Sequence, residues 1–179
     1  MEVPLSTKYQ VLLVQPNFKI GGNSFTGYWL PYSIGCLWSY ACSFDNISDN
    51  FEVSDIVYKR EDPDKLVERT KHSNIALFSC YMWNWEWTKV VAQKLKEQNP
   101  EITIIFGGPQ ITNRPLEENF FNNHPYVDSI SLNEGEETTV KMLESYLAGE
   151  PLEQIYQGGR LDELDIPSPY LTGVFDKIM

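Results

Sequence analysis

Cysteine and histidine are scarce in this chain of 179 residues, and their scarcity excludes several kinds of site. The three cysteines, Cys36, Cys42 and Cys80, form no CxxC pair, so a structural zinc site is not expected. The CxxxCxxC triplet that holds an iron–sulfur cluster is absent as well. A small, odd number of cysteines fits a reducing compartment better than a disulfide scaffold. The chain is therefore expected to be cytoplasmic.

Other common signatures are missing too. There is no GxGxxG, no GxxxxGK followed by Ser or Thr, and no GxSxG, so the usual phosphate-binding loops and the hydrolase nucleophile elbow are absent. No apolar run reaches the 18 or so residues that a membrane-spanning helix needs. Met1 to Gln10 contain no long apolar stretch, so a secretory signal is not expected.

Basic residues are few relative to acidic ones. The chain has 14 Lys and Arg against 25 Asp and Glu, a formal net charge of −11. Such a balance argues against a surface that binds nucleic acid or anionic lipid, so neither partner is expected. Hydrophobic residues make up 42% and aromatic residues 13% of the chain, which is enough to form a packed core. The length suggests one domain.

Buried-strand patterns alternate with amphipathic helical patterns along the chain. Strands are expected at Tyr9–Gln15, Phe51–Tyr58, Asn74–Ser79, Glu101–Phe106 and Tyr126–Leu132. Helices are expected from Pro31 to Ala41, over Asp62–Lys71, from Asn84 to Asn99, over Leu116–Asn122 and from Gly135 to Leu147. Five alternations predict an α/β fold, a doubly wound five-stranded parallel sheet with helices on both faces. From Pro151 onward the chain is expected to be mostly turns.

The third of these helical segments, from Asn84 to Asn99, allows finer predictions. The side chain of Asn84 is expected to cap the helix by accepting a hydrogen bond from a backbone N–H two or three residues on. Its inner face is predicted to comprise Trp87, Val90, Val91 and Leu95.

Ligands of doubly wound folds bind beyond the carboxyl ends of the strands, so the loops after the strands are the candidate site. Three of these loops carry glycines that would let backbone approach a ligand closely, and one is crowded with aromatic and sulfur-containing side chains. The mixture predicts a pocket for a cofactor with apolar faces and hydrogen-bonding groups rather than for a bare phosphate. The candidate cofactor-binding residues are Pro16, Leu30, Pro31, Ser79, Cys80, Tyr81, Met82, Trp83, Asn84, Gly107, Gly108, Pro109, Gln110, Asn133, Glu134, Gly135 and Glu136. No catalytic residue and no metal ligand is assigned.

Six segments carry a family resemblance when they are taken together and in order. They are VLLVQP, LPYSIGCLWSYA, SCYMWNW, KEQNPEITIIFGGPQ, DSISLNEGEET and LDELDIPSPYL. From Val11 to Met179 the chain resembles the N-terminal cobalamin-binding domain of cobalamin-dependent radical S-adenosylmethionine (SAM) enzymes. The resemblance implies a flavodoxin-like or Rossmann-like fold that holds cobalamin at the strand carboxyl ends. It implies a cobalamin-binding domain over residues 1–150 and a linker over residues 151–179, leading towards a radical SAM domain.

The resemblance also implies roles for individual loops. The segment from Ser79 to Trp85 would line the lower side of cobalamin and its nucleotide tail. Backbone at Gly107, Gly108 and Pro109 would pass close to the tail or ring, and residues 134–136 would bound the pocket. SAM and a 4Fe–4S cluster would belong to the radical SAM domain in cis. This chain alone would then be inactive, and the whole protein would perform methyl transfer or a related radical reaction.

Neither histidine fits the DxHxxG motif by which another cobalamin family ligates cobalt. His72 has Thr70 two residues before it, and His124 has Asn122 there, where the motif requires Asp. Ligation of cobalt by a protein imidazole is therefore not expected. The lower face of the cofactor would meet Met82, Trp83 or a water molecule instead.

The same residues also allow structural interpretations. The Gly-Gly-Pro segment can be a tight turn, Glu134 and Glu136 can simply favour the positive end of a helix, and the tryptophans can pack in the core. A second class of function is thus a doubly wound domain without a cofactor that serves interaction or scaffolding. A receiver-type signalling domain is disfavoured because Gln15, Pro16 and Asn17 stand where acidic residues would be needed.

Overall fold

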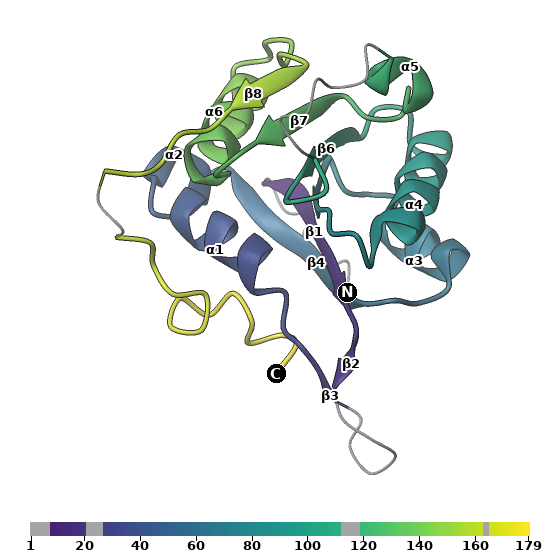
Figure 1. Cartoon of the computed structure of the whole chain (residues 1–179). Coiled ribbons are helices and arrows are strands. Elements are labelled where there is room, and N and C mark those ends of the chain that lie inside the picture. Colours follow the sequence, from purple (N-terminus) through teal and green to yellow (C-terminus); the bar gives the residue numbers. More distant parts are fainter. Residues whose placement is uncertain (1–7, 21–26, 112–118, 163–164) are drawn as a thin grey trace, which may run out of the picture.

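The computed structural model describes residues 8–20, 27–111, 119–162 and 165–179 (Figure 1). Its main sheet has six strands in the order β4-β1-β5-β6-β7-β8, and every neighbouring pair is parallel. The strands are β1 (Tyr9–Asn17), β4 (Phe51–Lys59), β5 (Ile75–Ser79), β6 (Thr103–Gly107), β7 (Ser129–Leu132) and β8 (Ile155–Gln157). A short antiparallel ladder joins β2 (Lys19–Ile20) to β3 (Gly27–Tyr28).

The first five strands of this sheet follow the flavodoxin-like order 2-1-3-4-5, which confirms the predicted doubly wound parallel fold. Each expected strand is present, with small differences at its ends. The connection order reverses between β1 and β5, so the switch point at which such folds bind ligands lies there.

The sheet has six strands rather than the expected five. Strand β8 pairs with β7 through Ile130 opposite Ile155 and Leu132 opposite Gln157. It lies in the segment that was predicted to consist of turns. With only three residues, of which Tyr156 alone is buried, β8 is too short to show a strand pattern in the sequence.

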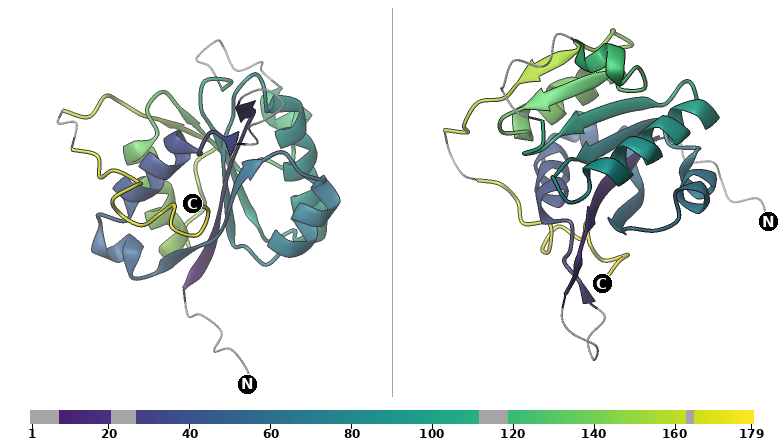
Figure 2. Two further views of the ribbon diagram at one scale, coloured as in Figure 1. Left: turned by 90° about the horizontal axis from the view of Figure 1, so that it is seen from below. Right: turned by 45° about the vertical axis from the view of Figure 1, so that its right-hand side comes forward.

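Helices cover both faces of the sheet (Figure 2). One face carries α1 (Tyr32–Ala41), α2 (Asp45–Ser48) and α6 (Glu136–Leu147), and the other carries α3 (Pro63–Thr70), α4 (Trp85–Gln98) and α5 (Phe120–Asn123). Side chains of β1 alternate between the two layers because successive strand residues point to opposite faces. Leu13 therefore packs with the α1 layer and Leu12 with the α4 layer, and both are fully buried.

One helical prediction needs correction, and part of another concerns residues that the structure does not describe. In α4 the buried residues are Thr88, Val91, Ala92 and Leu95, whereas Val90 is 45% exposed. The inner face is thus rotated from the predicted one, because Thr88 and Ala92 are small enough to pack closely. The helix expected over Leu116–Asn122 appears as α5, and residues 112–118 lie outside the described part of the chain.

The carboxy-terminal residues pack against α1 rather than extending away from it. Phe175 is fully buried, and a Cβ built on Gly35 would lie only 2.8 Å from its Cε1 atom. The hydroxyl oxygens of Ser39 and Thr172 are 2.9 Å apart. The domain boundary between residues 150 and 151 stays a prediction, but β8 and this contact attach the later residues to the first 150. Among the described helices, none is both long and apolar enough to cross a membrane.

Candidate functional site

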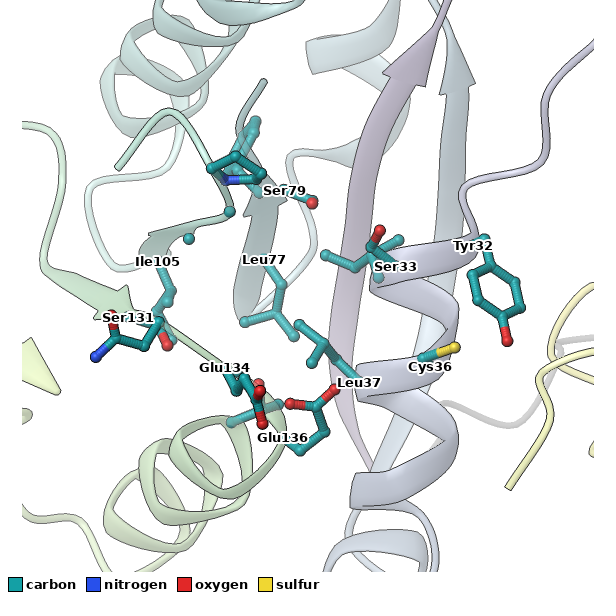
Figure 3. A pocket seen from close by; sticks show the side chains of 18 of the residues that line it. Tyr32, Ser33, Cys36, Leu37, Leu77, Ser79, Ile105, Ser131, Glu134 and Glu136 are labelled. Atoms are coloured by element: carbon teal, nitrogen blue, oxygen red, sulfur yellow. The ribbon is translucent and has the colours of Figure 1, made fainter. Parts of the chain in front are cut away.

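A cavity of about 420 Å³ lies at the carboxyl ends of β5, β6 and β7, between α1 and α6 (Figure 3). Its volume falls in the range of roughly 300–1,000 Å³ that is typical of small-molecule sites. The buried part of its lining includes the apolar Leu77, Ile105 and Met142 and the polar Ser79, Ser131 and Thr139, whereas Asn133 and Glu134 are exposed. The full lining is Tyr32, Ser33, Ile34, Cys36, Leu37, Leu77, Phe78, Ser79, Tyr81, Ile105, Gly107, Gly108, Pro109, Ser131, Asn133, Glu134, Gly135, Glu136, Thr139, Met142 and Ile166.

Polar contacts from two neighbouring strands fix the α1 wall of the cavity. The buried Gln15, near the end of β1, accepts a hydrogen bond at Oε1 from the backbone N–H of Ile34 at 2.9 Å. This bond satisfies one of the free amide groups at the start of the helix. The hydroxyl oxygens of Ser33 and Tyr81 lie 2.7 Å apart, which joins α1 to the loop after β5. The wall is therefore held from both β1 and β5.

Asn84 organises the loop after β5. Its side chain is fully buried, and its Oδ1 atom accepts a hydrogen bond from the N–H of Tyr81 at 2.8 Å. Its Nδ2 atom donates to the carbonyl oxygen of Ser79 at 3.1 Å and to that of Pro16 at 3.4 Å. The predicted capping bond to a later N–H is absent, so the prediction was wrong about the partner. The Asn84 side chain thus bonds to residues that precede it in the chain, and it links the ends of β1 and β5.

Gly107, the last residue of β6, and Gly108, which follows it, have different structural roles. Gly108 has a φ of +92°, and a Cβ built on it would lie 2.8 Å from the carbonyl oxygen of Cys80. The turn itself therefore requires glycine at position 108. Gly107 has no such constraint: a Cβ there would meet the Cβ of Ser131 at 3.5 Å, an ordinary contact. Both glycines line the cavity. A side chain introduced at Gly107 can therefore show whether a ligand lies close to this backbone, and it does so without straining the turn.

The loop after β7 forms the opposite wall. Asn133 is in the left-handed region with a φ of 64°, and its Nδ2 atom donates to the carbonyl oxygen of Gly158 at 3.2 Å. The hydroxyl oxygens of Ser131 and Thr138 are 2.6 Å apart and join the end of β7 to α6. Glu136, the first residue of α6, has its Oε2 atom buried, and no residue of the described chain donates a hydrogen bond to it.

Neither cysteine near the site is a reactive thiolate. Burial raises the pKa of Cys36, and the nearby Glu136 carboxylate adds to the rise. Burial also raises the pKa of the fully buried Cys80, whose Sγ atom contacts the carbonyl oxygen of Phe78 at 3.7 Å. Both thiols are therefore protonated at neutral pH. Within the described ranges, no group of three or more His, Cys, Asp or Glu side chains could hold a metal ion.

The structure brings some of the predicted cofactor-binding residues together in the lining of the cavity. The candidates that line the cavity are Ser79, Tyr81, Gly107, Gly108, Pro109, Asn133, Glu134, Gly135 and Glu136. The candidates outside its lining are Pro16, Leu30, Pro31, Cys80, Met82, Trp83, Asn84 and Gln110. Whether any of them contacts a cofactor stays a prediction.

Several lining residues come from positions that the loops did not indicate. Cys36, Leu37, Thr139 and Met142 belong to α1 and α6, and Ile166 belongs to the carboxy-terminal segment. For the helical residues a signal existed, since Ile34, Leu37, Trp38 and Ala41 recur at the i, i+3, i+4, i+7 spacing of an apolar stripe on one face of α1. The sequence does not show that this stripe extends past the sheet edge into a cavity.

Trp83 and Met82 lie beside the cavity rather than in its lining. The Trp83 ring stacks on Tyr81 with centroids 4.4 Å apart, contacts Phe18 edge to face, and is 38% exposed. Met82 is 81% exposed. Trp87 packs partly buried against the core, as predicted, and its Nε1 atom donates to the carbonyl oxygen of Glu61 at 2.9 Å. The predicted role of residues 82 and 83 at the lower face of a cofactor stays a prediction.

Comparison with known proteins shows the family to which this chain belongs. Residues 45–143 match the family model of the B12 binding domain. The chain is 31% identical over 163 residues to the cobalamin-dependent radical SAM methyltransferase TokK of Streptomyces tokunonensis. It is 29% identical over 163 residues to the 2-(S-pantetheinyl)-carbapenam-3-carboxylate methyltransferase of Streptantibioticus cattleyicolor. In both cases the match covers 82% of this chain and 24% of the relative.

Among solved structures, the N-terminal domain of a hypothetical protein from Thermotoga maritima is similar, with a TM-score of 0.43 and 20% identity. The similarity covers 79% of this chain and all of the other. The family match covers more than half of the chain, from α2 into α6, and so includes the strand ends around the cavity. The chain belongs to the B12-binding domain family and is homologous to one part of cobalamin-dependent radical SAM methyltransferases.

Proposed function

We propose that this chain binds cobalamin in the cavity between α1 and α6. The observation that carries the proposal is the position of the cavity, which lies at the strand carboxyl ends close to the β1/β5 switch point of a B12-binding domain. The residues that would hold the cofactor are those of the cavity wall, with backbone at Gly107 and side chains at Ser79, Ser131 and Glu136.

The lining suits a ligand with flat apolar parts and polar edges. Leu77, Ile105 and Met142 offer apolar contact to a planar base or ring face. Ser33 and Ser131 offer hydroxyl groups nearby. Gly107 leaves space where a side chain would narrow the cavity. The volume of about 420 Å³ suits the nucleotide tail of cobalamin, and the larger corrin ring would remain outside it.

We further propose that no protein histidine ligates cobalt. His124 lies in an aromatic cluster with Trp85 and Tyr126, and its Nδ1 atom is 2.9 Å from the Tyr126 hydroxyl oxygen. Neither His124 nor His72 lines the cavity. The nearest candidates for the lower face of the cofactor are Met82 and Trp83, which lie next to the wall residue Tyr81.

The chain spans 24% of the length of the curated relatives that it matches, so any activity is proposed for a larger protein. In that protein a radical SAM domain in cis would bring SAM and a 4Fe–4S cluster, and the reaction would be methyl transfer or related radical chemistry. Bound cobalamin supplies a cobalt ion that can carry and release a methyl group. This chain would hold the cofactor in place, in a cytoplasmic setting, and would perform no turnover alone.

The proposal predicts binding of cobalamin without coordination by a protein nitrogen. Equilibrium dialysis against hydroxocobalamin should give saturable binding near one cofactor per chain, and Gly107→Val should weaken it. After reduction to cob(II)alamin, paramagnetic resonance should show the same cobalt signal with unlabelled and nitrogen-15-labelled protein. Labelling of the protein separates a protein imidazole from the cofactor's own base, which keeps its natural nitrogen.

Two results would contradict these statements. A superhyperfine pattern that changes with nitrogen-15 labelling and returns to the unligated form in His72→Gln or His124→Gln would show a histidine ligand. A folded chain that does not retain hydroxocobalamin on dialysis would leave the interaction or scaffolding function in place of cofactor binding.

A further inference from the structure

One carboxylate oxygen in the cavity has no hydrogen-bond partner among the described residues. The Oε2 atom of Glu136 is buried, and none of the described side chains or backbone groups donates a hydrogen bond to it. Figure 3 shows the Glu136 carboxylate beside Leu37, in the gap between α6 and α1. A buried carboxylate oxygen without a donor costs free energy, because it loses its hydration and gains nothing in return.

The helix offsets only part of this cost. Glu136 is the first residue of α6, where the positive end of the helix dipole favours a carboxylate. Glu137, its neighbour in the same first turn, benefits from the same dipole and has Lys141 within 3.9 Å. Unlike Glu136, Glu137 does not line the cavity. The difference between these two residues is therefore their contact with the cavity, and not their contribution to the helix start.

We propose that Glu136 binds the cofactor directly. Its carboxylate accepts a hydrogen bond from a neutral donor of the bound cofactor, either a hydroxyl group or an amide N–H. This inference rests on the proposed binding of cobalamin. Cobalamin carries such donors in two places, the amide groups around the corrin and the ribose of the nucleotide tail. The phosphate of the tail is excluded as the partner, because Glu134 and Glu136 together make this wall negative.

The experiment compares Glu136→Ala with the matched control Glu137→Ala. Each variant removes one carboxylate from the first turn of α6, and only the first removes a cavity oxygen. Dissociation constants are measured for cobalamin and for cobinamide, which keeps the corrin amides and lacks the nucleotide. Thermal unfolding midpoints are measured without ligand, because a purely structural role of Glu136 would appear there.

A hydrogen bond to a charged acceptor predicts that Glu136→Ala weakens cobalamin binding by about 10- to 100-fold. Its unfolding midpoint without ligand should be no lower than that of Glu137→Ala, because an unsatisfied oxygen is removed. Glu137→Ala should change the affinity by less than about twofold. A loss for cobalamin alone places the donor on the nucleotide, and an equal loss for cobinamide places it on the corrin.

The inference is overturned if Glu136→Ala binds cobalamin as tightly as the wild-type chain does. It is also overturned if the affinity falls only together with the ligand-free unfolding midpoint, since Glu136 would then act through the fold. The wild-type titration separates these outcomes from a failure of the proposed function. A wild-type chain that binds no cobalamin overturns both proposals, whereas normal wild-type binding with an unaffected variant overturns this one alone.

Discussion

Replacement of Asn84 by leucine should lower the free energy of unfolding by about 3 to 5 kcal/mol. The Asn84 side chain is fully buried and makes three hydrogen bonds to backbone groups, at Pro16, Ser79 and Tyr81. Leucine is similar in size but leaves all three groups without their partner. Each unsatisfied buried group costs about 1 to 3 kcal/mol. Urea unfolding followed by circular dichroism measures the loss.

The control is an asparagine that bonds at the surface. Asn46 in α2 donates to Glu144 at 2.9 Å in an exposed position, so Asn46→Leu should cost less than about 1 kcal/mol. If Asn84→Leu were as mild as Asn46→Leu, the backbone groups at the ends of β1 and β5 would have other partners. The account of Asn84 as the link between these two strands would then be wrong.

Replacement of Gly108 by valine should destabilise the chain by about 3 kcal/mol or more. A β-branched residue is strongly disfavoured at a φ of +92°, and its Cβ would lie 2.8 Å from the carbonyl oxygen and 2.9 Å from the backbone nitrogen of Cys80. Cys80 cannot easily move, because its N–H donates to the carbonyl oxygen of Gly107 at 2.7 Å and its own carbonyl oxygen accepts from Gln110 at 3.0 Å.

The adjacent glycine provides the comparison. Gly107→Ala adds a Cβ at ordinary contact distance from Ser131 without a positive φ, so its free energy of unfolding, measured in urea, should stay within about 1 kcal/mol of the wild-type value. Gly108→Val therefore tests whether the turn requires glycine. Of the two positions, only Gly107 can be substituted to test contact with the cofactor. Equal effects at both positions would show that the turn does not select glycine by its backbone conformation.

Much of the fold was predictable because the strands are buried on both faces. Val11, Leu12, Leu13 and Val14 are all fully buried, and such continuous apolar runs between helical patterns are typical of parallel sheets. Doubly wound folds bind ligands beyond the carboxyl ends of their strands, so the loops there were the candidate site. Residues 107–109 and 133–136 were identified in this way, and they line the cavity.

Other features depend on tertiary contacts that no local pattern reveals. Strand β8 exists because β7 offers it a free edge, and the burial of Phe175 requires the space left by Gly35. The Asn84 side chain bonds backwards to Tyr81 because the ends of β1 and β5 lie side by side there. The approach of α1 to the start of α6 is likewise a tertiary contact: a Cβ on Gly135 would lie 3.1 Å from the methyl groups of Leu37.

The central claim, that cobalamin occupies the cavity between α1 and α6, is tested most directly by amide hydrogen exchange with and without hydroxocobalamin. The account predicts slower exchange in the ligand-bound chain at the start of α1, after β5, and over residues 107–111 and 133–139. Residues around the second hollow at the opposite edge, near Thr103, Asp128 and Tyr146, should exchange at unchanged rates. Slower exchange confined to that opposite edge, or identical exchange everywhere under saturating cofactor, would contradict the claim.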